Sequence, residues 1–239
     1  MEYAFLSDVG LTRENNEDYI IVDKKLSLFI ISDGMGGYNA GEVASKEACT
    51  VVYEHIKKNF KLNLDDKFYS NMIRDAILYA NDYIYKLANE DINKKDMGCT
   101  ILVALIVGNN CYIQHIGDSR ATLLNSDNYL RLTRDHTVVQ KLLDAGVIDE
   151  EKAKTHQYRH ALTQAIGLPE KLNIQKLNIK VKKNDKLLLS TDGLHDYVDK
   201  SVIKNIILKN RPKSAVKKLI AKANENGGKD NCSVILIKL

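Results

Sequence analysis

The sequence contains little that would divide the chain or anchor it in a membrane. Its 239 residues include two prolines and no tryptophan, and no stretch rich in serine, glycine or proline separates one part from another. The longest apolar runs, such as Ile101–Val107, are far shorter than the roughly 20 residues that a membrane-spanning helix needs. We therefore predict one domain over residues 1–239, with no membrane insertion.

Cysteine and excess charge are also scarce. The four cysteines form no C-x-x-C pair, and each lies in or beside an apolar run. We therefore expect buried free thiols in a reducing compartment. The first ten residues lack a basic start followed by an apolar run, so no signal peptide is expected and the predicted location is the cytoplasm. A net charge of +4 is too close to neutral to predict a nucleic-acid partner.

Several catalytic motifs are missing. A cysteine phosphatase needs Cys-x5-Arg, but the residues at that spacing after the four cysteines are His55, Leu105, Gly117 and Lys238. The P-loop motif G-x-x-x-x-G-K-[ST] is absent, as are G-x-S-x-G and H-E-x-x-H. No Cys or His pair has zinc-ligand spacing with a third ligand beside it, so zinc is disfavoured. His156 and His160 are four residues apart in a polar stretch, and no metal role is expected for them.

Two periodicities predict the secondary structure. Short runs rich in Ile, Val and Leu predict strands at residues 4–9, 19–22, 26–31, 100–107, 111–116, 121–124, 172–181, 186–189 and 233–237. Apolar residues at three- and four-residue spacing predict helices within 44–56, 73–88, 139–143, 202–207 and 216–223. Several strands follow one another without room for helices between them, so much of the sheet should be antiparallel. The predicted fold class is α+β.

Aspartates recur where the predicted strands begin or end. Asp33, Asp118 and Asp192 each follow an apolar run, and Asp230 precedes the last one. Two like charges about 4 Å apart repel by roughly 4 kcal/mol at an effective dielectric near 20, so a cluster of them requires cations. Carboxylates, a backbone carbonyl and water are ligands of Mg²⁺ and Mn²⁺. The alternative is that each aspartate only caps a turn.

The segment between the first two predicted strands adds Arg13, Glu17 and Asp18. The planar guanidinium of arginine suits phosphate oxygens. An arginine close to two further carboxylates suits a site that binds metal and phosphate together. A lone arginine in a loop is usually only solvated, so Arg13 matters in this context alone.

Five short motifs occur in order along most of the chain. They are Ser7-Asp8-x-Gly10-x-x-Arg13-x-x-Asn16-Glu17-Asp18, Asp33-Gly34-Met35-Gly36-Gly37, Gly117-Asp118-Ser119-Arg120, Thr191-Asp192-Gly193-Leu194 and Lys229-Asp230-Asn231. In this order they resemble the PP2C (PPM) family of metal-dependent protein phosphatases, and most closely its short bacterial members. The resemblance implies an α-β-β-α sandwich of two mainly antiparallel sheets flanked by helix pairs.

The resemblance also implies a core metal site with two ions, Mn²⁺ or Mg²⁺. Asp33 would bridge the two ions, and the carbonyl of Gly34 would bind one of them. Asp192 and Asp230 would hold the other. The implied reaction is hydrolysis of phosphoserine and phosphothreonine by direct attack of a metal-bridging hydroxide, without a phosphoenzyme.

Further residues match outer positions of the family's site. Glu17 and Asp18 match the acidic pair near the second metal, which they would bind directly or through water. Asp118 matches the residue that, with Asp192, binds a third metal in bacterial members. Arg13 matches the phosphate-binding arginine. Residues about 145–170 match a mobile flap beside the site.

Two departures from the family concern the proton donor. Eukaryotic members carry His directly after the Asp-Gly pair, where this chain has Met35, and many bacterial members carry His after the Gly-Gly pair, where it has Tyr38. We therefore expect the donor to be a water on the third metal near Asp118. His136 and His160 are the alternative donors.

The resemblance suggests partners as well. The expected substrates are phosphoserine and phosphothreonine proteins, and the expected partner is a membrane-anchored bacterial Ser/Thr kinase whose action this enzyme reverses. Two other functions remain open: an inactive module that binds phosphoproteins, and a small-molecule phosphohydrolase on the same scaffold. Inactive modules typically lack one or more of the metal carboxylates, whereas all of them are present here.

Overall fold

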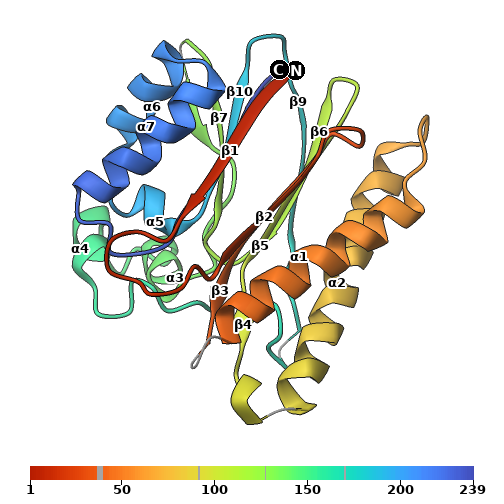
Figure 1. Ribbon diagram of the computed structural model, residues 1–239, viewed down its shortest axis with the longest axis horizontal. Coiled ribbons are helices and arrows are strands. Elements are labelled where there is room, and N and C mark those ends of the chain that lie inside the picture. Colours follow the sequence, from red (N-terminus) through yellow and green to blue (C-terminus); the bar gives the residue numbers. More distant parts are fainter. Residues whose placement is uncertain (37–39, 91, 127, 170) are drawn as a thin grey trace.

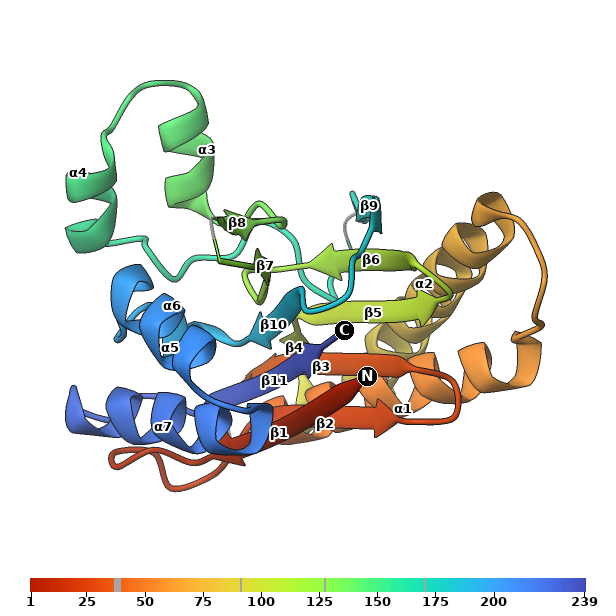
Figure 2. The ribbon, with the colours of Figure 1, turned by 90° about the horizontal axis from the view of Figure 1, so that it is seen from above.

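Two antiparallel β-sheets stack face to face, and helices cover the outer face of each sheet (Figures 1 and 2). This computed structural model describes residues 1–36, 40–90, 92–126, 128–169 and 171–239. The first sheet has the strand order β1-β11-β10-β7-β8 and the second has the order β2-β3-β5-β6-β9, with β4 paired to β3. The expected α-β-β-α sandwich is confirmed.

The elements have the following bounds. The strands are β1 Glu2–Asp8, β2 Asp18–Asp23, β3 Leu28–Met35, β4 Gly98–Cys99, β5 Ile101–Val107, β6 Asn110–Ile116, β7 Arg120–Leu124, β8 Tyr129–Arg131, β9 Gln175–Lys180, β10 Lys186–Ser190 and β11 Cys232–Lys238. The helices are α1 Ala40–Asn59, α2 Asp66–Glu90, α3 Val138–Asp144, α4 Glu150–Thr155, α5 Asp192–His195, α6 Lys200–Lys209 and α7 Pro212–Glu225, with a short 3₁₀ helix at Ile92–Lys94.

Three apolar layers hold the sandwich together. One lies between α1, α2 and the second sheet, one between α5, α6, α7 and the first sheet, and one between the two sheets. Strand β3 contributes to two of them, because successive side chains of a strand point to opposite faces. Leu28 and Ile30 pack toward the helices, whereas Phe29 and Ile31 pack toward the other sheet. Burial on both faces explains why the central strands are continuous apolar runs.

All nine strands expected from the sequence are present, and the structure adds β4 and β8. Both additions are very short, so no period could show them. Strand β3 also extends further than expected, because Gly34 and Met35 pair with β4. Asp33 therefore lies within a strand rather than beyond its end. The Asp192-Gly193 pair opens helix α5 instead of forming a simple turn.

Helices α3 and α4 differ from the others because neither buries a residue of its own. They stand out from the sandwich near β7 and β8 (Figure 2). Helix α4 was missed because its residues are almost all polar and carry no apolar stripe. This part of the chain overlaps the expected flap at about 145–170, and the mobility of that flap stays a prediction.

The four cysteines, Cys49, Cys99, Cys111 and Cys232, are all buried free thiols, as expected. Among the helices of the described residues, none is both long and apolar enough to cross a membrane.

Candidate active site

Five aspartates from separate segments meet where the two sheets adjoin. The antiparallel register of β2 and β3 sets Asp18 opposite Asp33. Asp192 begins α5 directly after β10, and Asp230 directly precedes Asn231 and β11, the neighbour of β10 in the sheet. Asp118 lies in the connection from β6 to β7, which passes from the second sheet to the first. The topology thus gathers carboxylates that lie far apart in the sequence.

These carboxylates are close enough to repel one another. Desolvation raises the pKa of Asp33 well above its usual value, and the charges of Asp18, Asp192 and Asp118 raise it further. Desolvation also raises the pKa of Asp118, again with a contribution from Asp192. The pKa of buried Asp18 is raised to about 7, first by desolvation.

Unsatisfied oxygens show that the cluster suits a cation. Asp18 Oδ1 and Asp192 Oδ1 are buried and have no hydrogen-bond partner among the described residues. The other oxygen of Asp18 accepts a hydrogen bond of 2.8 Å from the Thr191 hydroxyl. A buried carboxylate oxygen without a partner is costly unless a cation completes its surroundings. The donor set is made of carboxylate oxygens, which suits Mg²⁺ or Mn²⁺.

The backbone approaches the cluster closely at Gly34. Its N–H donates to the carbonyl of Glu17 over 3.0 Å, and a Cβ atom at this position would collide with the carbonyl oxygen of Gly41. Only glycine fits between these two segments. The side chain of Glu17 lies beside Gly41, and desolvation raises its pKa while the charge of Arg13 opposes this rise. Glu17 and Gly34 are thus held beside Asp18 and Asp33.

Arg13 lies at the rim of the cluster. Its Nη2 atom is 2.9 Å from Asp230 Oδ1 and 3.0 Å from Oδ2, and its side chain is 48% exposed. About half of the Arg13 side chain therefore remains accessible to solvent. Arg13 is placed where it can reach an anion entering the cluster.

Three polar residues that the sequence did not single out hold the cluster in place. Thr100 Oγ1 accepts the N–H of Asp33 over 2.9 Å and lies 2.8 Å from the hydroxyl of Ser119. The Asn231 amide donates to the carbonyls of Val9 and Asn15 and accepts the N–H of Glu17. Thr191 also accepts the N–H of Ser233.

Two of these residues carried a signal that could have found them. Thr191 and Asn231 lie directly beside Asp192 and Asp230 in the motifs quoted above. Thr100 precedes an apolar strand and carries no such signal.

The two candidate donor histidines lie in different places. His160 Nδ1 is 3.7 Å from Asp192 Oδ2 and 3.5 Å from Asp196 Oδ2, an arrangement that could hold an ion. The Asp192 carboxylate raises the pKa of His160. His136 instead accepts a hydrogen bond from the N–H of Gly117 over 3.2 Å. No local pattern in the sequence predicts that His160 lies beside Asp192. Tyr38 lies outside the described residues.

A cavity of about 1070 Å³ opens beside the cluster, between α3 and α4 on one side and β7, β8, α5 and α6 on the other. Asp118, Asp192 and His160 line one part of it, and apolar side chains such as Leu143 and Ile203 line another. It is large enough to receive several residues of a polypeptide next to the carboxylates.

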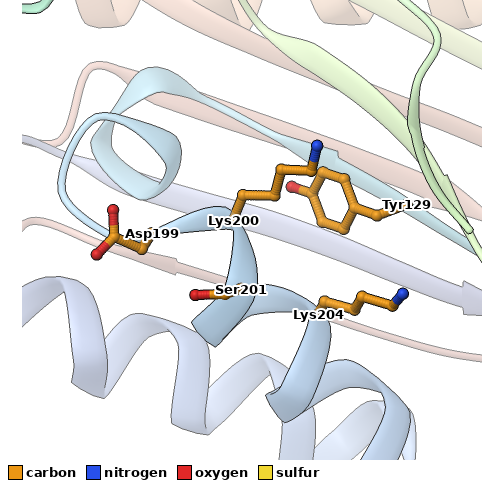
Figure 3. A pocket seen from close by; sticks show the side chains of 5 residues that line it. All are labelled: Tyr129, Asp199, Lys200, Ser201 and Lys204. Carbon is orange, nitrogen blue, oxygen red and sulfur yellow. The ribbon is translucent and has the colours of Figure 1, made fainter. Parts of the chain in front are cut away.

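A second, smaller pocket of about 550 Å³ lies beside the first, at the start of α6 (Figure 3). Its lining residues are Tyr129, Asp199, Lys200, Ser201 and Lys204. Lys200 Nζ lies 5.4 Å from the centre of the Tyr129 ring, a cation–π contact. None of its lining residues belongs to the aspartate cluster, but Tyr129, Asp199 and Lys200 also line the larger cavity, so the two pockets adjoin.

Known proteins resemble the chain along its whole length. The model of the family "Protein phosphatase 2C" matches residues 12–221. The chain belongs to the protein phosphatase 2C family. Protein phosphatase PhpP of Streptococcus pneumoniae is 32% identical over 246 residues, which cover 100% of this chain and 98% of that protein.

Solved structures agree with this membership of the protein phosphatase 2C family. The serine/threonine phosphatase Stp1 from Staphylococcus aureus has a TM-score of 0.89 and 33% identity, over 100% of this chain and 94% of that one. The catalytic domain of the phosphatase PstP in complex with two manganese ions has a TM-score of 0.87 and 30% identity, over 98% of this chain and 96% of that one.

The raised carboxylate pKa values of this family member predict how its metal-free stability depends on pH. Folded Asp18, with a pKa of about 7, and Asp33 and Asp118, with pKa values well above 3.8, retain protons that the unfolded chain has lost. These carboxyl groups should therefore lower the free energy of unfolding in chelator as the pH rises from about 4, the unfolded value, through the folded pKa of Asp18 of about 7. Buried His115 and His195, whose pKa values are lowered, act in the opposite sense up to about pH 6.5, so the net fall should be clearest above about pH 6.5, where Asp18 passes through its folded pKa.

Urea denaturation in the presence of chelator measures this slope. Asp33→Asn should flatten it, since the substitution removes one of the mutually repelling charges. A free energy of unfolding that rises over the same pH window would contradict the account.

Proposed function

We propose that this protein is a metal-dependent protein phosphatase that hydrolyses phosphoserine and phosphothreonine. The observation that carries the proposal is the convergence of Asp18, Asp33, Asp118, Asp192 and Asp230, with two buried oxygens left unpaired, in a protein phosphatase 2C chain. Such a site opposes folding unless cations occupy it, and cations beside an arginine suit a phosphate ester.

The proposed metal site follows from the positions of the donors. Asp33 and the carbonyl of Gly34 would hold one divalent ion, and Asp33, Asp192 and Asp230 would hold a second. Asp18 and Glu17 would act near the second ion, directly or through water. Asp118 and Asp192 would hold a third ion, with Mn²⁺ or Mg²⁺ at each position. When bound, such ions lower the pKa of water and neutralise charge on the phosphoryl oxygens.

The protein's own groups would orient the substrate. Arg13 would bind two phosphoryl oxygens through its guanidinium fork, and Asp230, which contacts Arg13, would keep that fork aimed at the cluster. A departing serine or threonine alkoxide needs a proton. A water beside Asp118 would supply it, with His160 as the alternative. His136 is less suitable, because its Nδ1 is occupied by the N–H of Gly117.

The relatives named as serine/threonine phosphatases support protein substrates for this chain, and the large cavity beside the cluster supports binding of an extended segment. We further propose that the chain reverses the action of a membrane-anchored Ser/Thr kinase in the cytoplasm, where its four free thiols would persist. An inactive binding module is disfavoured, because every acidic position of the proposed site is occupied by Asp or Glu.

Asp192→Asn should abolish the activity without unfolding the protein. Asparagine keeps the size of the side chain but removes its negative charge. The Asp192 carboxylate is the group affected, and its Oδ1 atom has no hydrogen-bond partner among the described residues. We expect kcat on a phosphopeptide to fall by at least ~100-fold, even at saturating Mn²⁺. Asp82→Asn changes an exposed aspartate of α2 that lies outside both the cluster and its cavity, so it is the matched control and should stay near wild type. Full turnover by Asp192→Asn in saturating Mn²⁺ would refute the assignment of this residue.

Substrate class can be tested with the wild-type protein. We expect a phosphothreonine peptide to have a kcat/KM at least ~10-fold above that of a nucleotide, because a peptide can fill the neighbouring cavity with several residues whereas a nucleotide fills less of it. Chelator should abolish turnover of both substrates. A preference for the nucleotide would favour a small-molecule phosphohydrolase, and binding of the phosphopeptide without turnover would favour an inactive module.

A further inference from the structure

Asp118 occupies the short crossover between the two sheets and has no strand pairing of its own. Strand β6 ends its ladder at Ile116 and β7 begins its ladder at Arg120. Gly117 has a φ of +102°, and a Cβ atom there would lie 2.5 Å from Thr100 Cγ2. The direction of the Asp118 side chain therefore depends on what fixes its two neighbours, and on one side the Ser119 hydroxyl lies 2.8 Å from Thr100 Oγ1. On the other side it depends on what fixes the Gly117 backbone.

His136 forms hydrogen bonds with both the N–H and the carbonyl of Gly117. The N–H of Gly117 donates to His136 Nδ1 over 3.2 Å, and the N–H of His136 donates to the carbonyl of Gly117 over 2.8 Å. The Nε2 atom of His115 lies 2.9 Å from the same carbonyl, and the two rings have their centres 4.6 Å apart. For Nδ1 of His136 to accept a hydrogen bond, that nitrogen must carry no proton.

The same residue also lies at the base of the segment with α3 and α4. The carbonyl of His136 accepts the N–H of Thr163 over 2.7 Å. Next to it, Thr137 forms an antiparallel bridge with Leu162. His136 therefore connects the Asp118 crossover to the point where both ends of residues 138–161 meet.

Other links keep this region attached when the imidazole is removed. Arg120 Nη2 is 2.6 Å from Asp135 Oδ2, and the hydroxyl of Thr133 accepts the N–H of Ala121 over 3.0 Å. The backbone bond from His136 to Gly117 does not need the side chain at all. A substitution of His136 should thus free the N–H of Gly117 without detaching the strand-to-strand connection.

We propose that His136 is a positioning residue whose Nδ1 fixes the Gly117 backbone and so aims Asp118 into the aspartate cluster. The inference rests on the proposed function, in which Asp118 belongs to the catalytic site. His136 acts through Asp118 and does not contact the substrate.

Two substitutions of His136 separate its hydrogen bond from its bulk. His136→Ala removes the acceptor, whereas His136→Asn can present an amide oxygen near the position of Nδ1. Loss of a partner that orients a ligand typically costs 10–100-fold in metal affinity or activity, so we expect about a 10-fold lower kcat for His136→Ala, with KM within about twofold. His136→Asn should recover to within about threefold of wild type. Equal losses in both variants would overturn the proposal.

The decisive comparison is a double-mutant cycle with Asp118→Ala. If His136 acts through Asp118, then His136→Ala should lower kcat by less than about twofold in the Asp118→Ala background. Independent losses that multiply would overturn the proposal. Ile207→Ala, a core substitution in α6, is the control for lost stability, and it should not reproduce the kcat loss at an equal fall in Tm.

Calorimetric titration with Mn²⁺ gives a readout that does not depend on activity. His136→Ala should weaken the same binding event that Asp118→Ala weakens, and His136→Asn should restore it. An unchanged isotherm for His136→Ala beside a changed one for Asp118→Ala would overturn the positioning role. Absence of turnover in the wild type would count against the proposed function, while the titration would still test His136.

Discussion

Mutual repulsion among buried carboxylates is the constraint on which this structure depends. Desolvation and neighbouring charges both oppose ionisation of Asp33 and Asp118, so the metal-free cluster destabilises the fold. Three apolar layers offset this cost, because the strands that deliver the aspartates are buried on both faces. Apolar packing elsewhere in the molecule therefore keeps the carboxylates close together, where cations can bind them.

The framework around the cluster is built from small and hydroxylated residues. Gly34 allows the backbones of β3, β2 and α1 to approach closely, and Thr191 and Thr100 tie neighbouring segments together. These contacts fix the carboxylates without adding positive charge. The charge balance is thus left to bound cations, to Arg13 at the rim and to Arg120, whose charge acts on Asp118.

Much of the fold followed from the sequence, because the central strands are buried on both faces and therefore stand as short continuous apolar runs. The aspartates that meet in the structure were also predicted, since each adjoins such a run, and Arg13 was predicted only in their context. Their roles in binding metal and phosphate stay predictions. Helix α4 and strand β4 were missed, because a polar helix and a two-residue strand carry no period. The position of His160 beside Asp192 depends on how residues 138–161 dock, which no local pattern encodes.

The central claim is that divalent cations bind among these aspartates. Anomalous diffraction from Mn²⁺-loaded crystals tests it most directly. The account predicts at least two ion peaks within coordination distance of Asp33, Asp192 and Asp230. Crystals saturated with Mn²⁺ that showed no peak in the cluster, or peaks only at unrelated surface carboxylates, would contradict it.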